Sequence, residues 1–188
     1  MQGDTMKILR IGFLISFLLP FAANAADTYF EADYMMFTVE GKPSFVPGTY
    51  DAEPTGLGLK FGAKFSPNLG VEGLFVFGMG DDPFETTTLD VEVSNIIGVY
   101  GVGTFPVSPV VDVFGKAGIA IVTYEDADGD EIDGTGLSFG FGGAFNVGTG
   151  AIVVEYLIFP ETEYDMSVWG AEFTADSHSF NIGYRVNL

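Results

Sequence analysis

The segment 178–188 alternates between apolar and polar residues almost without interruption. Its apolar members are Phe180, Ile182, Tyr184, Val186 and Leu188. Because successive side chains of a β-strand point to opposite faces, this segment is predicted to be a strand with one apolar face. The same pattern recurs along the chain, so the sequence predicts a sheet whose two faces meet different surroundings.

The first 25 residues have the pattern of a secretory signal peptide. A positively charged start and an apolar run at 11–19 precede the small-x-small sequence Ala23-Asn24-Ala25. The apolar run is about half as long as a membrane-spanning helix, so cleavage is expected after the last of these alanines. Met6 is an alternative translation start. The remainder, 26–188, is long enough for one domain.

Eight segments of this remainder alternate in the same way and are bounded by Gly, Pro, Asn and Asp. The predicted strands are 28–40, 55–66, 69–80, 88–105, 110–124, 135–146, 150–159 and 178–188. Helical periodicity is absent from the remainder, so the sequence predicts an all-β fold.

The connections between the predicted strands are alternately short and long. Tight turns are predicted at 66–69, 106–109 and 146–149. The long, polar and acidic connections are 41–54, 81–87, 125–134 and 160–177. An even number of strands with this asymmetry is typical of a bacterial outer-membrane barrel. We therefore expect an eight-stranded antiparallel up-and-down transmembrane β-barrel, with both termini at the short-turn, periplasmic end.

The composition of the two strand faces indicates which of them is outside. A soluble lipocalin-like barrel also alternates, but with its apolar face inward. Here the second face is mostly small, as at Ser138, Gly140, Gly142 and Ala144. A surface in water is usually rich in charged residues, whereas a narrow barrel interior has room for little besides small ones. The apolar face is therefore predicted to contact lipid.

Aromatic residues on the predicted lipid face gather near the short turns and in the last strand. They are Phe65, Phe105, Phe145 and Tyr184. Aromatic side chains at this level form the girdles of outer-membrane barrels at the membrane interface. A closed barrel also satisfies every backbone group within the membrane, which an open sheet cannot do.

The chain resembles the small eight-stranded outer-membrane barrels, which include the transmembrane domain of outer-membrane protein A and the opacity-type barrels. The resemblance extends over 26–188 and rests on the architecture, on the turn at 105–109 leading into 112–118, and on the terminal strand. It implies location in the outer membrane of a Gram-negative bacterium, contact with lipid and lipopolysaccharide, and insertion by the barrel-assembly machinery. Members commonly end in Phe, whereas the last residue here is Leu188.

The charge balance makes nucleic acid an unsuitable partner. The chain has 26 acidic and 7 basic residues, and such an excess of negative charge repels phosphate. The acidic segment 126–134 resembles a calcium loop, but Glu131 occupies the glycine position of an EF-hand and Leu137 the position of its bidentate Glu. We expect weak binding of divalent cations at the acidic loops, no specific metal site and no cofactor.

His178 is the only histidine, and it raises the question of catalysis. Its neighbours Asp176, Ser177 and Ser179 include the residue types of a catalytic triad. Consecutive residues of one strand point to opposite faces, so this run cannot form a triad by itself. The sequence therefore predicts that the protein is not an enzyme.

Basic residues are scarce, and most of those in 26–188 lie on the predicted inward face together with five acidic residues. These nine residues are Glu31, Asp33, Lys60, Lys64, Glu72, Asp112, Lys116, Glu155 and Arg185. Because an unpaired charge in a confined interior costs several kcal/mol, they are predicted to form a neutralising network that plugs the lumen. A turn at 67–69 would set Lys64 opposite Glu72, and barrel closure would set Arg185 beside Glu31 and Asp33.

Three functional hypotheses follow from this pattern. The first is a non-enzymatic integral outer-membrane protein with a polar plugged lumen, acidic extracellular loops and a structural or surface-interaction role. The alternative is a narrow porin-like pore for ions or small solutes, which differs only in whether the inward polar residues close the lumen. A lipid A-modifying enzyme is the least favoured.

Overall fold

A computed structural model describes residues 27–43, 50–80, 82–83, 90–126, 131–166 and 171–188. The predicted signal peptide, 1–25, lies outside the described residues. Eight long strands make up the fold: β1 (Asp27–Pro43), β3 (Thr55–Ser66), β4 (Leu69–Gly80), β6 (Asp90–Ser108), β7 (Val111–Asp126), β8 (Glu131–Val147), β9 (Gly150–Ile158) and β11 (Ala171–Asn187). Three short strands extend this sheet: β2 (Tyr50–Ala52), β5 (Asp82–Pro83) and β10 (Thr162–Met166).

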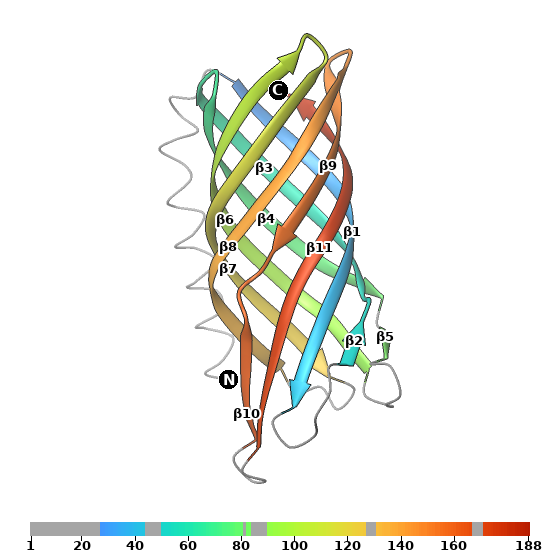
Figure 1. Ribbon diagram of the computed structural model, residues 1–188. Coiled ribbons are helices and arrows are strands. Elements are labelled where there is room, and N and C mark those ends of the chain that lie inside the picture. Colours follow the sequence, from blue (N-terminus) through green and yellow to red (C-terminus); the bar gives the residue numbers. More distant parts are fainter. Residues whose placement is uncertain (1–26, 44–49, 81, 84–89, 127–130, 167–170) are drawn as a thin grey trace, which may run out of the picture.

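The long strands form a closed antiparallel barrel (Figure 1). Each pairs with the long strand before it and after it in the sequence, and β11 also pairs with β1. The predicted fold class, an eight-stranded up-and-down β-barrel, is confirmed. No helix among the described residues is long and apolar enough to cross a membrane.

The short turns and the long connections lie at opposite ends of the barrel (Figure 1). The short turns are the two-residue connections 67–68, 109–110 and 148–149. Gly148 has a φ of 62°, which a glycine adopts without the steric penalty of a Cβ. The amide of Leu188 donates to the carbonyl of Thr28 over 2.9 Å, so the last residue and the start of β1 also lie at this end.

Several strands are longer at the long-connection end than the sequence predicted. The predicted strand at 178–188 begins at Ala171, the one at 135–146 begins at Glu131, and the connection 160–177 contains β10. Alternation of apolar residues reveals a strand only where one face meets lipid. These extensions are rich in Glu, Asp and Thr, and they continue the hydrogen-bonded ladder beyond the predicted bounds.

The outer surface of the barrel carries an apolar belt. Exposed outward side chains on it include Phe30, Tyr34, Phe61, Phe77, Ile119, Phe139, Phe141, Ile152, Phe180 and Ile182. The four residues of the predicted girdle are exposed as well, between 47% for Tyr184 and 71% for Phe105. Such a surface is too large and too apolar for water and suits a bilayer.

The barrel is taller than this belt requires. β1, β8 and β11 have 17 residues each, against about 9–11 for one tilted membrane crossing. Beyond the apolar belt the outward positions of β1 become polar, with Thr38 and then Glu40 following Met36. The long-connection ends of these strands therefore stand clear of the membrane.

Two adjacent glycines of β8 face opposite sides of the barrel wall. Substituting them by alanine is therefore expected to have different effects on stability. A Cβ at Gly142 would collide with the Val154 carbonyl oxygen and lie 2.6 Å from the Phe114 ring, whereas one at Gly143 would lie 3.6 Å from its nearest neighbour. We expect Gly142→Ala to lower the free energy of unfolding by roughly 1–3 kcal/mol and Gly143→Ala to change it little. Urea unfolding in lipid vesicles measures the free energy of unfolding of both variants. Equal effects of the two substitutions would contradict this close packing of β8 against β9.

Candidate functional site

The charged side chains of the barrel interior converge in the half nearer the short turns. Strand periodicity explains their common direction: Glu31 and Asp33 are two residues apart on β1 and therefore point to the same side. Six strands contribute to this cluster. We call it the luminal charge network, and its members are Glu31, Asp33, Lys60, Glu72, Lys116, Glu155 and Arg185. Every member is buried, with at most 7% of its surface exposed.

Lys60 lies at the centre of the network. Its Nζ atom donates hydrogen bonds to Glu31 Oε1 over 2.8 Å and to Glu155 Oε2 over 2.6 Å, and it lies 3.0 Å from Asp33 Oδ2. One ammonium group thus joins carboxyl groups of β1 and β9 across the lumen. Its position near three acids compensates for the loss of its hydration.

Two further basic residues complete the ion pairs. Lys116 Nζ lies 2.6 Å from Glu72 Oε1 and 2.6 Å from Glu155 Oε1. Arg185 Nε lies 2.6 Å from Glu31 Oε2. Glu31 and Glu155 therefore each bridge two bases, and the ion pairs connect β1, β3, β4, β7, β9 and β11 into one cluster.

Neutral side chains enclose this cluster. The Tyr29 hydroxyl donates to Glu72 Oε2 over 2.6 Å, and the Arg185 guanidinium stacks 4.2 Å from the centre of the Tyr29 ring. Asn181 Nδ2 donates to Glu155 Oε2 over 3.3 Å. On the short-turn side, the centre of the Phe114 ring lies 5.6 Å from the Arg185 guanidinium carbon. Two aromatic rings thus cover the guanidinium of Arg185, which is 7% exposed.

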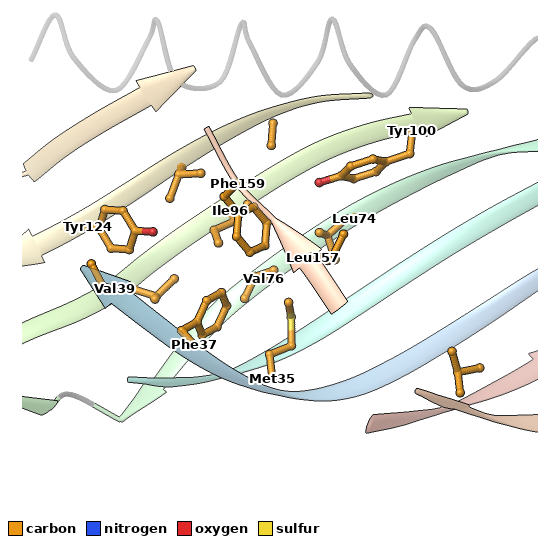
Figure 2. Packing of buried hydrophobic residues seen from close by; sticks show 14 of the residues in the cluster. Met35, Phe37, Val39, Leu74, Val76, Ile96, Tyr100, Tyr124, Leu157 and Phe159 are labelled. Carbon is orange, nitrogen blue, oxygen red and sulfur yellow. The ribbon is translucent and has the colours of Figure 1, made fainter. Parts of the chain in front are cut away.

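The half of the lumen nearer the long connections is filled mainly by apolar side chains, which pack against one another in Figure 2, although Ser177 and Ser179 are also buried there. We call this set the apolar layer, and its members are Met35, Phe37, Val39, Leu74, Val76, Ile96, Val122, Tyr124, Leu157 and Phe159. The rings of Phe37 and Phe159 lie 5.8 Å apart. All ten side chains are at most 4% exposed. The expected polar lumen is therefore wrong for this half, because the inward positions of β1 change from Glu31 and Asp33 to Met35, Phe37 and Val39.

The closed barrel and its apolar outer belt agree with a comparison of the sequence against known protein families. The family described as outer membrane protein beta-barrel domain matches residues 11–187. The chain belongs to this family of outer-membrane β-barrels. This membership supports the predicted location in the outer membrane. A comparison with curated proteins found no match.

Solved structures of outer-membrane barrels resemble the chain in fold. Neisserial surface protein A is 14% identical with a TM-score of 0.58, covering 85% of this chain and 96% of its own. OprG from Pseudomonas aeruginosa is 14% identical with a TM-score of 0.57, covering 88% and 97%. Ail from Yersinia pestis is 20% identical with a TM-score of 0.51, covering 85% and 97%. Identities of this size show a shared fold and not a shared partner.

Seven of the nine residues that the sequence placed in the lumen of this barrel lie together in the luminal charge network. Arg185 pairs in register with Glu31, as barrel closure predicted. Lys64 and Asp112 are only half-buried and lie nearer the short turns. Asp112 accepts a hydrogen bond from Asn146 Nδ2 over 3.0 Å.

The expected pairing of Lys64 with Glu72 is wrong. Lys64 pairs with Gly70, and Glu72 lies opposite Gly62. The turn contains two residues rather than three, and a bulge between Lys64 and Ser66 shifts the register once more. Together these changes move Glu72 toward Lys116 and Tyr29.

The sequence pattern did not identify Tyr29 as a neutral partner of the network. Tyr29 has the same strand parity as Glu31, and this parity was the signal that could have identified it. Tyr100 and Ser138, which share a hydrogen bond of 3.0 Å, are a further inward pair. A tyrosine ring suits lipid and its hydroxyl suits the lumen, so the residue type alone does not place Tyr29 or Tyr100 on either face.

Outside the lumen, the sequence had drawn attention to His178 and to the acidic loop. The His178 ring lies 5.3 Å from the Tyr156 ring, where the apolar belt ends. No group of potential metal ligands occurs within the described residues. The tip of the acidic loop, 127–130, lies outside them. At the long-connection end, Lys42 donates to Asp176 over 2.5 Å, and this hydrogen bond raises the pKa of the exposed Lys42.

Proposed function

We propose that this protein is a closed, non-enzymatic outer-membrane barrel that supports the envelope or presents acidic loops at the cell surface. In this proposal the short turns and both termini lie in the periplasm, the belt contacts lipid and lipopolysaccharide, and the barrel-assembly machinery inserts the chain. The observation that carries it is the filling of the lumen. Two consecutive layers, one of paired charges and one of apolar side chains, occupy the cross-section of the barrel.

Both layers oppose the passage of a solute. An ion that enters the luminal charge network has to displace ammonium–carboxylate contacts of 2.6 to 2.8 Å. A hydrated ion that enters the apolar layer has to lose its water among mainly apolar side chains, where a few hydroxyl groups, such as that of Tyr124, are the available replacement ligands. A pore needs an open path through both layers, so the packing supports the closed barrel over the porin-like alternative.

Conductance tests this proposal directly. Purified protein inserted into a planar lipid bilayer is expected to give no steady single-channel current. Phe30→Ala, which trims a lipid-facing side chain of β1, serves as the matched control and should stay silent as well. Large, steady currents from the unmodified protein would overturn the closed barrel and establish the pore. Changed lipid A in the mass spectrum of an expressing strain would instead establish the enzyme.

The acidity of the long connections supports a role at the surface. Sixteen of the 26 acidic residues and only one basic residue, Lys42, fall within the four predicted long connections. Ail is described in complex with a heparin analogue, sucrose octasulfate, which is a polyanion. Acidic loops repel such a ligand, so the partners we propose for this protein are cationic: basic protein surfaces, or weakly bound divalent cations.

Protease accessibility tests the proposed orientation. Protease added to intact cells is expected to cut within 41–54, 125–134 or 160–177 and to leave the three short turns intact, because exposed loop tips are preferred cleavage sites. Mass spectrometry of the fragments identifies the cut positions. Permeabilised cells are the control for access to the periplasmic side. Cleavage at 106–109 in intact cells, with intact long connections, would reverse the orientation.

A further inference from the structure

The charges of the lumen do not cancel. Among the described residues, four carboxyl groups and three basic groups are buried in the luminal charge network. The half-buried Lys64 and Asp112 add one charge of each sign and leave the difference unchanged. With every group ionised, the closed lumen would hold one uncompensated negative charge. A charge of this kind is costly in a medium that lacks water.

Glu31 and Glu72 are well supplied with hydrogen-bond donors. Glu31 accepts from Lys60 and from Arg185, over 2.8 and 2.6 Å. Glu72 accepts from Lys116 and from Tyr29, both over 2.6 Å. These two groups are therefore stabilised as carboxylates.

Glu155 is also well supplied, although hydrogen bonds reach only one of its two oxygens. It accepts hydrogen bonds from Lys60 over 2.6 Å and from Asn181 over 3.3 Å, and its second oxygen lies 2.6 Å from Lys116 Nζ. Two ammonium groups thus flank this carboxylate. The excess charge is not expected to reside here.

Asp33 has the poorest set of partners. It is 1% exposed, and neither of its oxygens accepts a hydrogen bond. Its closest cation, the Lys60 ammonium at 3.0 Å from Oδ2, is shared with Glu31 and Glu155, to which it donates hydrogen bonds. The other oxygen, Oδ1, is packed so tightly against Gly183 that a Cβ there would collide with it.

We propose that the lumen binds one proton at neutral pH and that Asp33 carries it. The tight contact with Gly183 leaves no room at Oδ1 for an alkali cation with its several oxygen ligands, whereas a proton needs none. Asn181 Oδ1 is buried on β11, two residues from the position that pairs with Asp33, and accepts no hydrogen bond, so it is the acceptor that we assign to the carboxylic hydroxyl. The proposal goes beyond the closed-barrel function and does not depend on any partner of the loops.

The other charged groups of the luminal charge network come from six strands around the lumen, and among them Lys60 contacts Asp33 directly. They are Glu31 of β1, Lys60 of β3, Glu72 of β4, Lys116 of β7, Glu155 of β9 and Arg185 of β11. The three bases are matched by the three glutamates, so a neutral Asp33 leaves the network balanced. Both Lys60 and Arg185 then keep their carboxylate partners.

Infrared spectroscopy detects the bound proton. The folded protein at neutral pH is expected to show the C=O stretch of a protonated carboxyl group, and Asp33→Asn is expected to remove it. The half-buried Asp112 provides the matched control, because Asp112→Asn should leave the band in place. Absence of the band from the wild-type protein would overturn the proposal, as would its persistence in Asp33→Asn.

The pH dependence of unfolding provides a second test. Above about pH 4, the ordinary range of an aspartic acid in water, the unfolded chain releases this proton while the folded chain keeps it. Stability therefore falls with rising pH, and the wild-type unfolding constant should rise relative to that of Asp33→Asn by up to tenfold per pH unit. A ratio that stays constant with pH, or that changes on exchange of sodium for potassium, would contradict a proton and indicate a bound cation.

Discussion

Lys60→Met is expected to lower the free energy of unfolding by about 3–5 kcal/mol, the usual cost of removing one partner from a buried ion pair. Methionine fills a similar volume but leaves Glu31 and Glu155 without the ammonium that joins them. Water cannot replace it, because both carboxylates are at most 1% exposed. Urea unfolding in lipid vesicles gives the free energy, and the temperature at which the folded band disappears from gels gives an independent measure.

Lys64→Met is the matched control for this prediction. It removes the same charge from the same strand, but Lys64 is half-buried near the short turns, and a small effect is expected. Adding Glu155→Gln to Lys60→Met removes one acid for the base that was lost. The double variant should therefore recover part of the lost free energy of unfolding, since Lys116 keeps Glu72 as a partner. Equal losses at Lys60 and Lys64 would show that the network does not stabilise the barrel.

The sequence predicted the barrel because its evidence is local and repeated. Each strand in the membrane shows period two, and the three short turns contain Pro, Asn or Gly where the chain reverses. The pairing of Arg185 with Glu31 followed from closure alone, because the last strand of a closed barrel must lie beside the first. These inferences need no knowledge of exact register.

Register and lumen composition were harder to predict. One bulge and one turn residue decided whether Glu72 faced Lys64 or Gly62, and neither leaves a clear mark in the sequence. The inward and outward positions of β1 are both apolar at Met35, Met36 and Phe37, so alternation gives no assignment there. Seven members of the charge network could thus be named from strand parity, whereas the apolar layer required the structure.

Phe37→Ala is expected to destabilise the barrel by about 3–5 kcal/mol, because it removes a large, 1% exposed side chain from the centre of the apolar layer. The Phe37 ring contacts the Phe159 ring across the lumen, and a Cβ at Gly56 would lie only 3.1 Å from it, so the surrounding wall is fitted to this ring. The strands cannot collapse into the space, since the hydrogen-bonded ladder fixes the barrel diameter. Brief current steps in planar bilayers are expected to accompany the loss.

Phe30→Ala separates this effect from the loss of an aromatic ring in general. Phe30 lies on the same strand but is 41% exposed and points toward lipid. Acyl chains can fill the space that the smaller residue leaves, so its effect on the free energy of unfolding should be well below that of Phe37→Ala. The comparison also distinguishes the two layers, because Phe37→Ala leaves every ion pair of the network intact. Unchanged stability in Phe37→Ala would show that the apolar layer does not stabilise the barrel. Reduced stability without any current in planar bilayers would show that the luminal charge network alone is sufficient to close the lumen.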